Sequence, residues 1–216
     1  MSIMINGAKY AIATVLAAPV AITAVTNASP PSATAASPPT AGDILLLSSG
    51  WGDLDEAVVR AGTVTGSAFL MPPYDATDLV RFPATEGVGA YQLATTFINL
   101  PKIHDIQVAG GDQQSATRQY VGDPTGKQVA APTFKNARTL TYLLDYDDSK
   151  PHFAAMIDLD RTKKIVVMRE TLPNGTIFYT PGRVAFNKEP TRTMNEFISN
   201  ALTFFPTADS VRYAGT

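Results

Sequence analysis

The sequence predicts a mainly β fold with one short α-helix. A long hairpin pattern is the first indication, because β-branched and aromatic runs at 164–171 and 177–186 flank a Pro-Asn-Gly-Thr segment. Asn-Gly between such runs is the strongest short hairpin signal. The second indication is a series of short apolar runs separated by Gly, Pro and Ser. Only one segment, residues 151–158, has helical apolar spacing. We assign the hairpin turn to Pro173, Asn174, Gly175 and Thr176.

Length and composition limit the possible functions. The chain has 216 residues, which suffices for one all-β domain or two small ones. Its net charge is −2, and it has no long Lys/Arg run. Tight binding to any nucleic acid depends on neutralising phosphates with Lys and Arg, so we do not expect it here. There is no cysteine, which excludes disulfides, thiolate metal sites and Cys nucleophiles.

The N-terminal segment resembles a secretory signal at first sight. Lys9 precedes a mostly apolar stretch that extends to Val25. Thr14, Pro19 and Thr23 interrupt this stretch, and proline breaks a helix. We therefore expect a retained segment that is too short and too interrupted to span a bilayer, and no association with a membrane.

We expect residues 1–42 to form a strand-rich N-terminal arm that is part of the domain. Two short strands are predicted at residues 10–15 and 20–26, followed by an extended Pro/Ser/Ala/Thr-rich loop at 29–42. Residues 43–216 are expected to form a single β domain. Deletion of residues 1–40 should then leave a folded domain.

The remaining segments alternate between strands and loops. Residues 44–47, 58–71, 87–100 and 139–144 read as strands, and residues 197–205 are a further apolar segment of ambiguous period that Pro206 ends. Residues 104–132 are rich in Gly, Gln, Asp and Thr, so we interpret them as a long interaction loop or a projecting hairpin. A helix is expected to begin at Pro151 with Ser149 as its N-cap, and to bury Phe153, Met156 and Ile157 on one face.

No arrangement of residues indicates catalysis. His104 and His152 are far apart in different predicted elements, and each is expected on the surface. The Asp residues at 145–148 and at 158 and 160 lack the glycine and distant glutamate of a calcium-binding loop. The Gly87-Val-Gly89 segment leads into a strand and lacks the third glycine of a dinucleotide motif. We expect no enzyme activity, no metal site and no cofactor.

The order of elements resembles the tail tube proteins of long, non-contractile-tailed bacteriophages. The resemblance is carried by residues 161–188, which hold the hairpin, by the helix before them, and by 10–26, 41–51 and 53–64. It implies a tail-tube-like β-sandwich or barrel with one flanking helix. It also implies hexameric rings that stack into a hollow tail, through which double-stranded DNA passes without specific binding.

The resemblance further implies partners and contact surfaces. The expected partners are identical copies, a tape-measure protein, a tail terminator, and distal tail or baseplate proteins. The expected location is the virion tail, with assembly in the host cytoplasm. We assign contacts between subunits or rings to residues of the arm and of the long loop: Tyr10, Ile12, Val20, Ile22, Gln113, Gln114, Arg118 and Tyr120.

A second function stays open at this point. The signal-like start and the scattered Tyr and Trp side chains also fit a secreted β-sandwich that binds a carbohydrate or another ligand. Loss of the first 25–30 residues on export would favour that alternative.

Overall fold

The computed structural model describes residues 6–122, 124–192, 194–195 and 197–214. It contains one helix, α1 (Pro151–Thr162), among these residues. The strands are β1 (Lys9–Leu16), β2 (Val20–Val25), β3 (Ser32–Ala35), β4 (Ile44–Ser49), β5 (Val58–Arg60), β6 (Val64–Thr65), β7 (Ala68–Leu70), β8 (Gly89–Leu100), β9 (Ile103–Ala109), β10 (Gln113–Gln119), β11 (Gln128–Lys135), β12 (Thr139–Asp145), β13 (Val166–Thr171), β14 (Ile177–Phe186), β15 (Ser199–Pro206) and β16 (Val211–Tyr213). The mainly β prediction with one short helix is confirmed.

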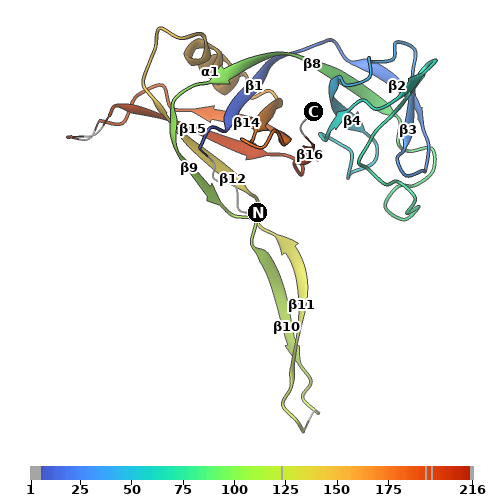
Figure 1. Ribbon diagram of the computed structural model, residues 1–216. Helices are drawn as coiled ribbons and strands as arrows, with labels where there is room; N and C mark the ends of the chain where they lie inside the picture. Colours follow the sequence, from blue (N-terminus) through green and yellow to red (C-terminus); the bar gives the residue numbers. More distant parts are fainter. Residues whose placement is uncertain (1–5, 123, 193, 196, 215–216) are drawn as a thin grey trace.

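Most strands belong to one large antiparallel sheet. Its order is β6-β7-β3-β2-β8-β1-β13-β14-β15-β12-β9, with β4 and β5 attached at β8 and β16 attached at β14. The sheet folds into two lobes that β8 connects (Figure 1). The small lobe comprises residues 17–93, with strands β2–β7 and the first half of β8. The sheet body holds β1, the second half of β8, β9 and β12–β16, with α1 packed against β14.

Each lobe has its own hydrophobic core. In the sheet body, Ile12, Met156, Leu202 and Phe204 are fully buried in one cluster. In the small lobe, Trp51 is the largest fully buried side chain of a second cluster. A third, smaller cluster from both lobes, which includes buried Val58 and Val167, lies between them. The lobes are therefore joined by apolar packing as well as by a shared strand.

The predicted Pro-Asn-Gly-Thr hairpin is confirmed as β13 and β14. Inside the turn, the Gly175 N–H donates to the Leu172 carbonyl at 2.9 Å, and the Asn174 side chain accepts the Thr176 N–H at 3.0 Å. Gly175 has φ +83°, which glycine adopts without strain. The sequence motif therefore correctly predicted both strands and the turn that joins them.

The two strands predicted in the N-terminal segment are present as β1 and β2, and the segment is integrated into the fold more deeply than the word arm suggests. Strand β1 lies in the interior of the sheet, where it pairs with β8 on one side and β13 on the other. Its residues 10–13 are all buried, as expected for a strand covered on both faces. The Pro/Ser-rich stretch also contributes β3, which pairs with β2 and β7. The segment is thus part of the fold in both lobes.

Helix α1 begins at Pro151 as predicted, but two details differ. Its N-cap is Lys150 without a side-chain hydrogen bond, because the Ser149 hydroxyl donates to Asp147 Oδ1 at 2.6 Å instead. The buried face is His152, Met156 and Leu159, so the prediction of a surface position for His152 is wrong. Ile157 is 36% exposed because the buried face is rotated toward His152 and Leu159.

Candidate assembly interface

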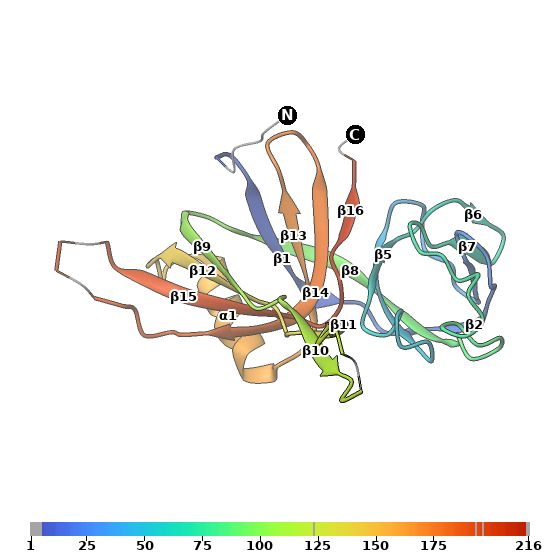
Figure 2. The ribbon, with the colours of Figure 1, turned by 90° about the horizontal axis from the view of Figure 1, so that it is seen from below.

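Strands β10 and β11 form a hairpin that projects from the sheet body. Figure 1 shows it extending away from both lobes, and Figure 2 shows the same hairpin from below. Its strands pair only with each other in a separate two-stranded sheet. Every residue of β11 is exposed, and in β10 only Gln114 is partly covered. A two-stranded hairpin without a packed face is marginally stable alone in water, so this element is suited to contact with another chain.

Two glycines fix the base of the hairpin. Gly110 and Gly111 have φ values of +75° and +83°, where other residues are strained. A Cβ at Gly110 would lie 2.0 Å from the Ala137 carbonyl oxygen, whereas one at Gly111 would meet nothing within 4 Å. The Gly111 N–H donates to the Asn136 carbonyl at 3.1 Å. The direction in which the hairpin leaves the body therefore depends on close backbone contact at Gly110.

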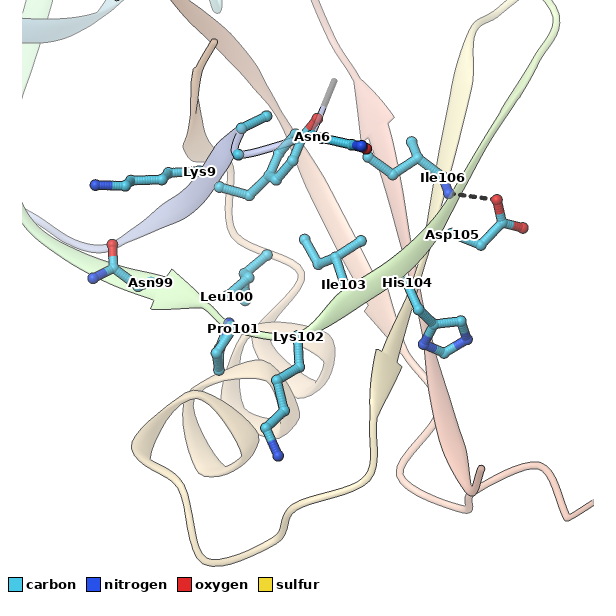
Figure 3. Close-up of a pocket in the computed structure, with 13 residues that line it drawn as sticks. Asn6, Lys9, Asn99, Leu100, Pro101, Lys102, Ile103, His104, Asp105 and Ile106 are labelled. Atoms are coloured by element: carbon cyan, nitrogen blue, oxygen red, sulfur yellow. Dashed lines mark hydrogen bonds between the residues drawn. The ribbon is translucent and has the colours of Figure 1, made fainter. Parts of the chain in front are cut away.

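Strand β9 presents an unpaired edge of the large sheet. Among the described strands it pairs with β12 alone, and most of its side chains are exposed. It borders a groove of about 850 Å³ between the β8–β9 turn and residues 6–10, which Figure 3 shows with Lys9, Lys102 and His104 around it. An open edge of this kind can pair with a strand of another chain.

The predicted contact residues of the N-terminal segment lie mostly inside the subunit. Ile12 and Ile22 are 0% and 5% exposed, in the sheet body and the small lobe respectively. The buried Tyr10 hydroxyl donates to Glu170 Oε1 at 2.9 Å, and burial together with this carboxylate raises the pKa of Tyr10. Val20 is half-buried in β2. We keep only Val20 of this group in the contact proposal below.

The structure brings the other four predicted contact residues together on one element. Gln113, Gln114 and Arg118 lie on β10, and Tyr120 follows directly after it. The Arg118 guanidinium lies 5.3 Å from the centre of the Tyr120 ring. Whether these side chains touch another subunit stays a prediction, which we develop below.

One exposed apolar segment was missed by the sequence reasoning. The loop between β14 and β15 carries Met194 and Phe197, each 90% exposed, next to Ile198 at 47%. Residue 197 starts the apolar segment whose period is ambiguous in the sequence, and the strand β15 begins only at Ser199. The available signal in the sequence was the position of Met194 and Phe197, which are large apolar residues directly after the charged stretch 188–192. Exposed apolar side chains in a cluster indicate an interaction surface.

The described residues hold neither a candidate metal-binding group nor a helix suited to crossing a membrane. Within it, no group of three or more His, Cys, Asp or Glu side chains is placed to hold a metal ion. His104 Nδ1 lies 3.4 Å from Asp145 Oδ1 on the surface. No helix of the described residues has the length and apolar character needed to cross a membrane. The arrangement can therefore recognise other polypeptides through strands, loops and exposed apolar side chains.

Comparison with known proteins agrees with a role in assembly. Residues 49–215 match the family model described as "Phage tail tube protein, TTP". No curated protein sequence matches the chain. A chain of the virion of a native gene transfer agent particle superposes with a TM-score of 0.42 and 9% identity, over 55% of this chain and 89% of that one. A chain from the sheath/tube terminator of the extracellular contractile injection system PVC gives a TM-score of 0.36 and 15% identity, over 54% and 87%. The family assignment rests on the sequence model alone.

Proposed function

Because the chain belongs to the phage tail tube protein family, we propose that it forms hexameric rings that stack into a hollow tail tube. It is a structural component of the virion tail and not an enzyme. The hairpin β10–β11 is the observation that supports stacking most strongly, because it is exposed along its length and has no core of its own. The family assignment also favours this function over the secreted binding module.

The contact surfaces of the proposal are three. Rings form when open strand edges such as β9 are continued by a neighbouring subunit, which also removes edges that would otherwise aggregate. Stacking uses the hairpin residues Gln113, Gln114, Arg118 and Tyr120, with Val20 as a further contact. The exposed β14–β15 loop adds an apolar contact through Met194 and Phe197.

The proposed tube is wide enough for double-stranded DNA. If six subunits each contribute about four strands to an inner barrel, strands about 4.8 Å apart and tilted by about 45° give a circumference of roughly 160 Å. The backbone diameter is then about 50 Å, and about 40 Å remains after the side chains. A double helix, with grooves of about 12 and 6 Å and an overall width of roughly 20 Å, is narrower than this opening. The net charge of −2 avoids a strong general attraction for phosphates.

The proposal includes partners at both ends of the tube. A tape-measure protein would occupy the lumen during assembly in the host cytoplasm, a tail terminator would close the head-proximal end, and distal tail or baseplate proteins would bind the tip. These partners follow from the family.

Electron microscopy of the purified full chain tests the proposal. Negative-stain images are expected to show rings with sixfold symmetry, and tubes at higher concentration. The matched variant replaces residues 112–135 with Asn-Gly, a turn that the paired Gly111 and Asn136 can accept. This variant is expected to keep its fold and to lose tube formation. Single subunits of the full chain at every concentration would contradict the proposed function.

A further inference from the structure

Charge is distributed unevenly between the parts of the subunit. The small lobe has two arginines and seven carboxylates, which are Asp43, Asp53, Asp55, Glu56, Asp75, Asp78 and Glu86. The rest of the chain carries more cations than carboxylates, although the net charge of the whole is only −2. Such separation of charge within one chain favours contact between unlike parts of two copies.

One loop of the small lobe combines exposed carboxylates with exposed apolar side chains. We name residues 75–88 the acidic loop. Leu79 and Val80 within it are 60% and 90% exposed, and Asp75, Asp78 and Glu86 of the same loop are exposed too. In the same lobe, Arg81 is already paired with Asp53 at 2.6 Å, so it neutralises a neighbour and not the loop's own carboxylates. Apolar side chains inside a charged rim are the usual composition of a protein contact.

The far half of the hairpin has the complementary composition. Arg118 pairs in register with Val129, and the Arg118 guanidinium lies against the Tyr120 ring, so these three side chains share one face. Lys127 directly precedes β11. Val121 at the tip is fully exposed, Tyr120 is 56% exposed and Val129 is 41% exposed. The far half of the hairpin therefore offers exposed apolar side chains together with two cations.

We infer that the hairpin of one copy docks on the acidic loop of a second copy. The cations Arg118 and Lys127 face the carboxylates Asp78 and Glu86, while Tyr120 and Val121 cover Leu79 and Val80. A groove of about 810 Å³ lies beside the acidic loop. Asp55, Asp75 and Phe82 border one side of it, and Lys135 and Asn136 at the base of the same copy's hairpin border another. The inference rests on the proposed function, because it names the surface that receives the hairpin in the assembled tail.

Charge reversal tests the inference on the full chain. The double variant Arg118→Glu/Lys127→Glu places like charges on both sides of the contact, so the affinity between copies is expected to fall by about tenfold or more. The variant Asp78→Lys/Glu86→Lys in the acidic loop is expected to lower the affinity between copies by a similar factor. Mixing the two variants, or combining all four changes, restores opposite charges and is expected to recover assembly. Sedimentation velocity measures the fraction assembled.

A matched control separates this contact from a general effect of charge. Lys164 is exposed and lies outside both surfaces, so Lys164→Glu changes the net charge as one hairpin substitution does and is expected to leave assembly unchanged. Salt shortens the Debye length to about 8 Å at 0.15 M and further above it, so the reversal effects are expected to shrink in high salt. Equal loss with Lys164→Glu, or no recovery in the mixture, overturns the inference.

A cross-link provides a direct second measurement. Because the chain has no native cysteine, Val121→Cys and Val80→Cys introduce the only thiols, both at exposed positions whose change does not disturb a core. Oxidation in the assembled state is expected to give covalent dimers and longer ladders on a non-reducing gel. The control pair Val121→Cys with Lys164→Cys is expected to remain monomeric.

The outcomes distinguish the two proposals. If the unmodified chain forms no rings or tubes, the proposed function fails. If it assembles but the Val121–Val80 pair does not cross-link above the control, the tube stands and the docking of the hairpin on the acidic loop is wrong.

Discussion

The Tyr213 hydroxyl donates a hydrogen bond to the Pro72 carbonyl oxygen at 3.0 Å, across the boundary between the sheet body and the small lobe. The same hydroxyl accepts the backbone N–H of Arg60 at 2.7 Å. One side chain on the short strand β16 thus satisfies two backbone groups of the small lobe. These two hydrogen bonds fix the relative position of the lobes, which the apolar cluster between them also holds together.

Tyr213→Phe should therefore loosen the connection between the lobes. The Arg60 N–H and the Pro72 carbonyl both lose their partner, and a buried polar group left unpaired costs about 1–3 kcal/mol. The free energy of unfolding, measured by urea denaturation, is expected to fall by about that amount. Tyr146→Phe removes a surface hydroxyl that bonds to Asp148 and is expected to change stability by about 0.5 kcal/mol or less. Equal effects of the two variants would contradict the role of Tyr213.

The two glycines at the hairpin base should respond differently to alanine. In Gly111→Ala the methyl group has space, so the variant is destabilised only by the positive φ, by about 1–2 kcal/mol. Gly110→Ala is destabilised in the same way and also places its Cβ against the Ala137 carbonyl oxygen, so the backbone must move. We expect Gly110→Ala to redirect the hairpin and reduce tube formation far more than Gly111→Ala. Tube length in electron micrographs measures the effect on assembly, and thermal unfolding measures the effect on stability. Tubes of similar length from both variants would contradict the special role of Gly110.

Truncation should distinguish the integrated N-terminal segment from the projecting hairpin. Removing residues 1–40 deletes β1 from between β8 and β13, together with β2 and β3. We now expect loss of the folded state, in contrast to the expectation from sequence. Replacing the hairpin removes no buried side chain of the three cores and is expected to leave unfolding cooperative. Circular dichroism with thermal melting of both truncated chains tests this contrast, which a cooperatively folding chain without residues 1–40 would refute.

Stability should decrease on acidification through His152. Burial lowers the pKa of His152 below its ordinary value of 6.5, and nearby Lys150 lowers it further while Asp147 opposes the shift. The unfolded chain then binds more protons than the folded chain as the pH falls below 6.5, so protonation favours unfolding. Between pH 7.5 and pH 5.5 the melting temperature is expected to drop less for His152→Gln than for the unchanged protein. An equal drop for both chains would contradict this role of His152.

Local signals in the sequence predicted the local structure well. The Asn174-Gly175 pair identified a hairpin because the turn needs a positive φ that glycine supplies. Pro151 marked the first turn of the helix, where a missing N–H costs nothing. The polar segment 104–132 was expected to be an interaction loop or a projecting hairpin. Residues 113–135 form a projecting hairpin, whereas residues 103–109 form β9 in the large sheet, so the prediction is only partly confirmed.

Long-range packing was not accessible from the same patterns. The run from Tyr10 to Ala13 is apolar in every position, which fits an interior strand, but nothing local says that its neighbours are β8 and β13. His152 is buried because α1 lies against β14, a contact set by tertiary structure. The exposed Met194 and Phe197 carry the same chemistry as core residues, so their exposure cannot be predicted from the residue types alone.

Strand β8 has a mechanical consequence for the whole subunit. Its residues 89–93 pair with β2 and β4, and its residues 94–100 pair with β1. A force that pulls on the small lobe is therefore transmitted through the main chain of β8 into the sheet body. The lobes can separate along β8 only if its hydrogen bonds to β2 and β4, or those to β1, break together. Bending of a filament built from such units would be absorbed at the junctions between molecules and not inside them.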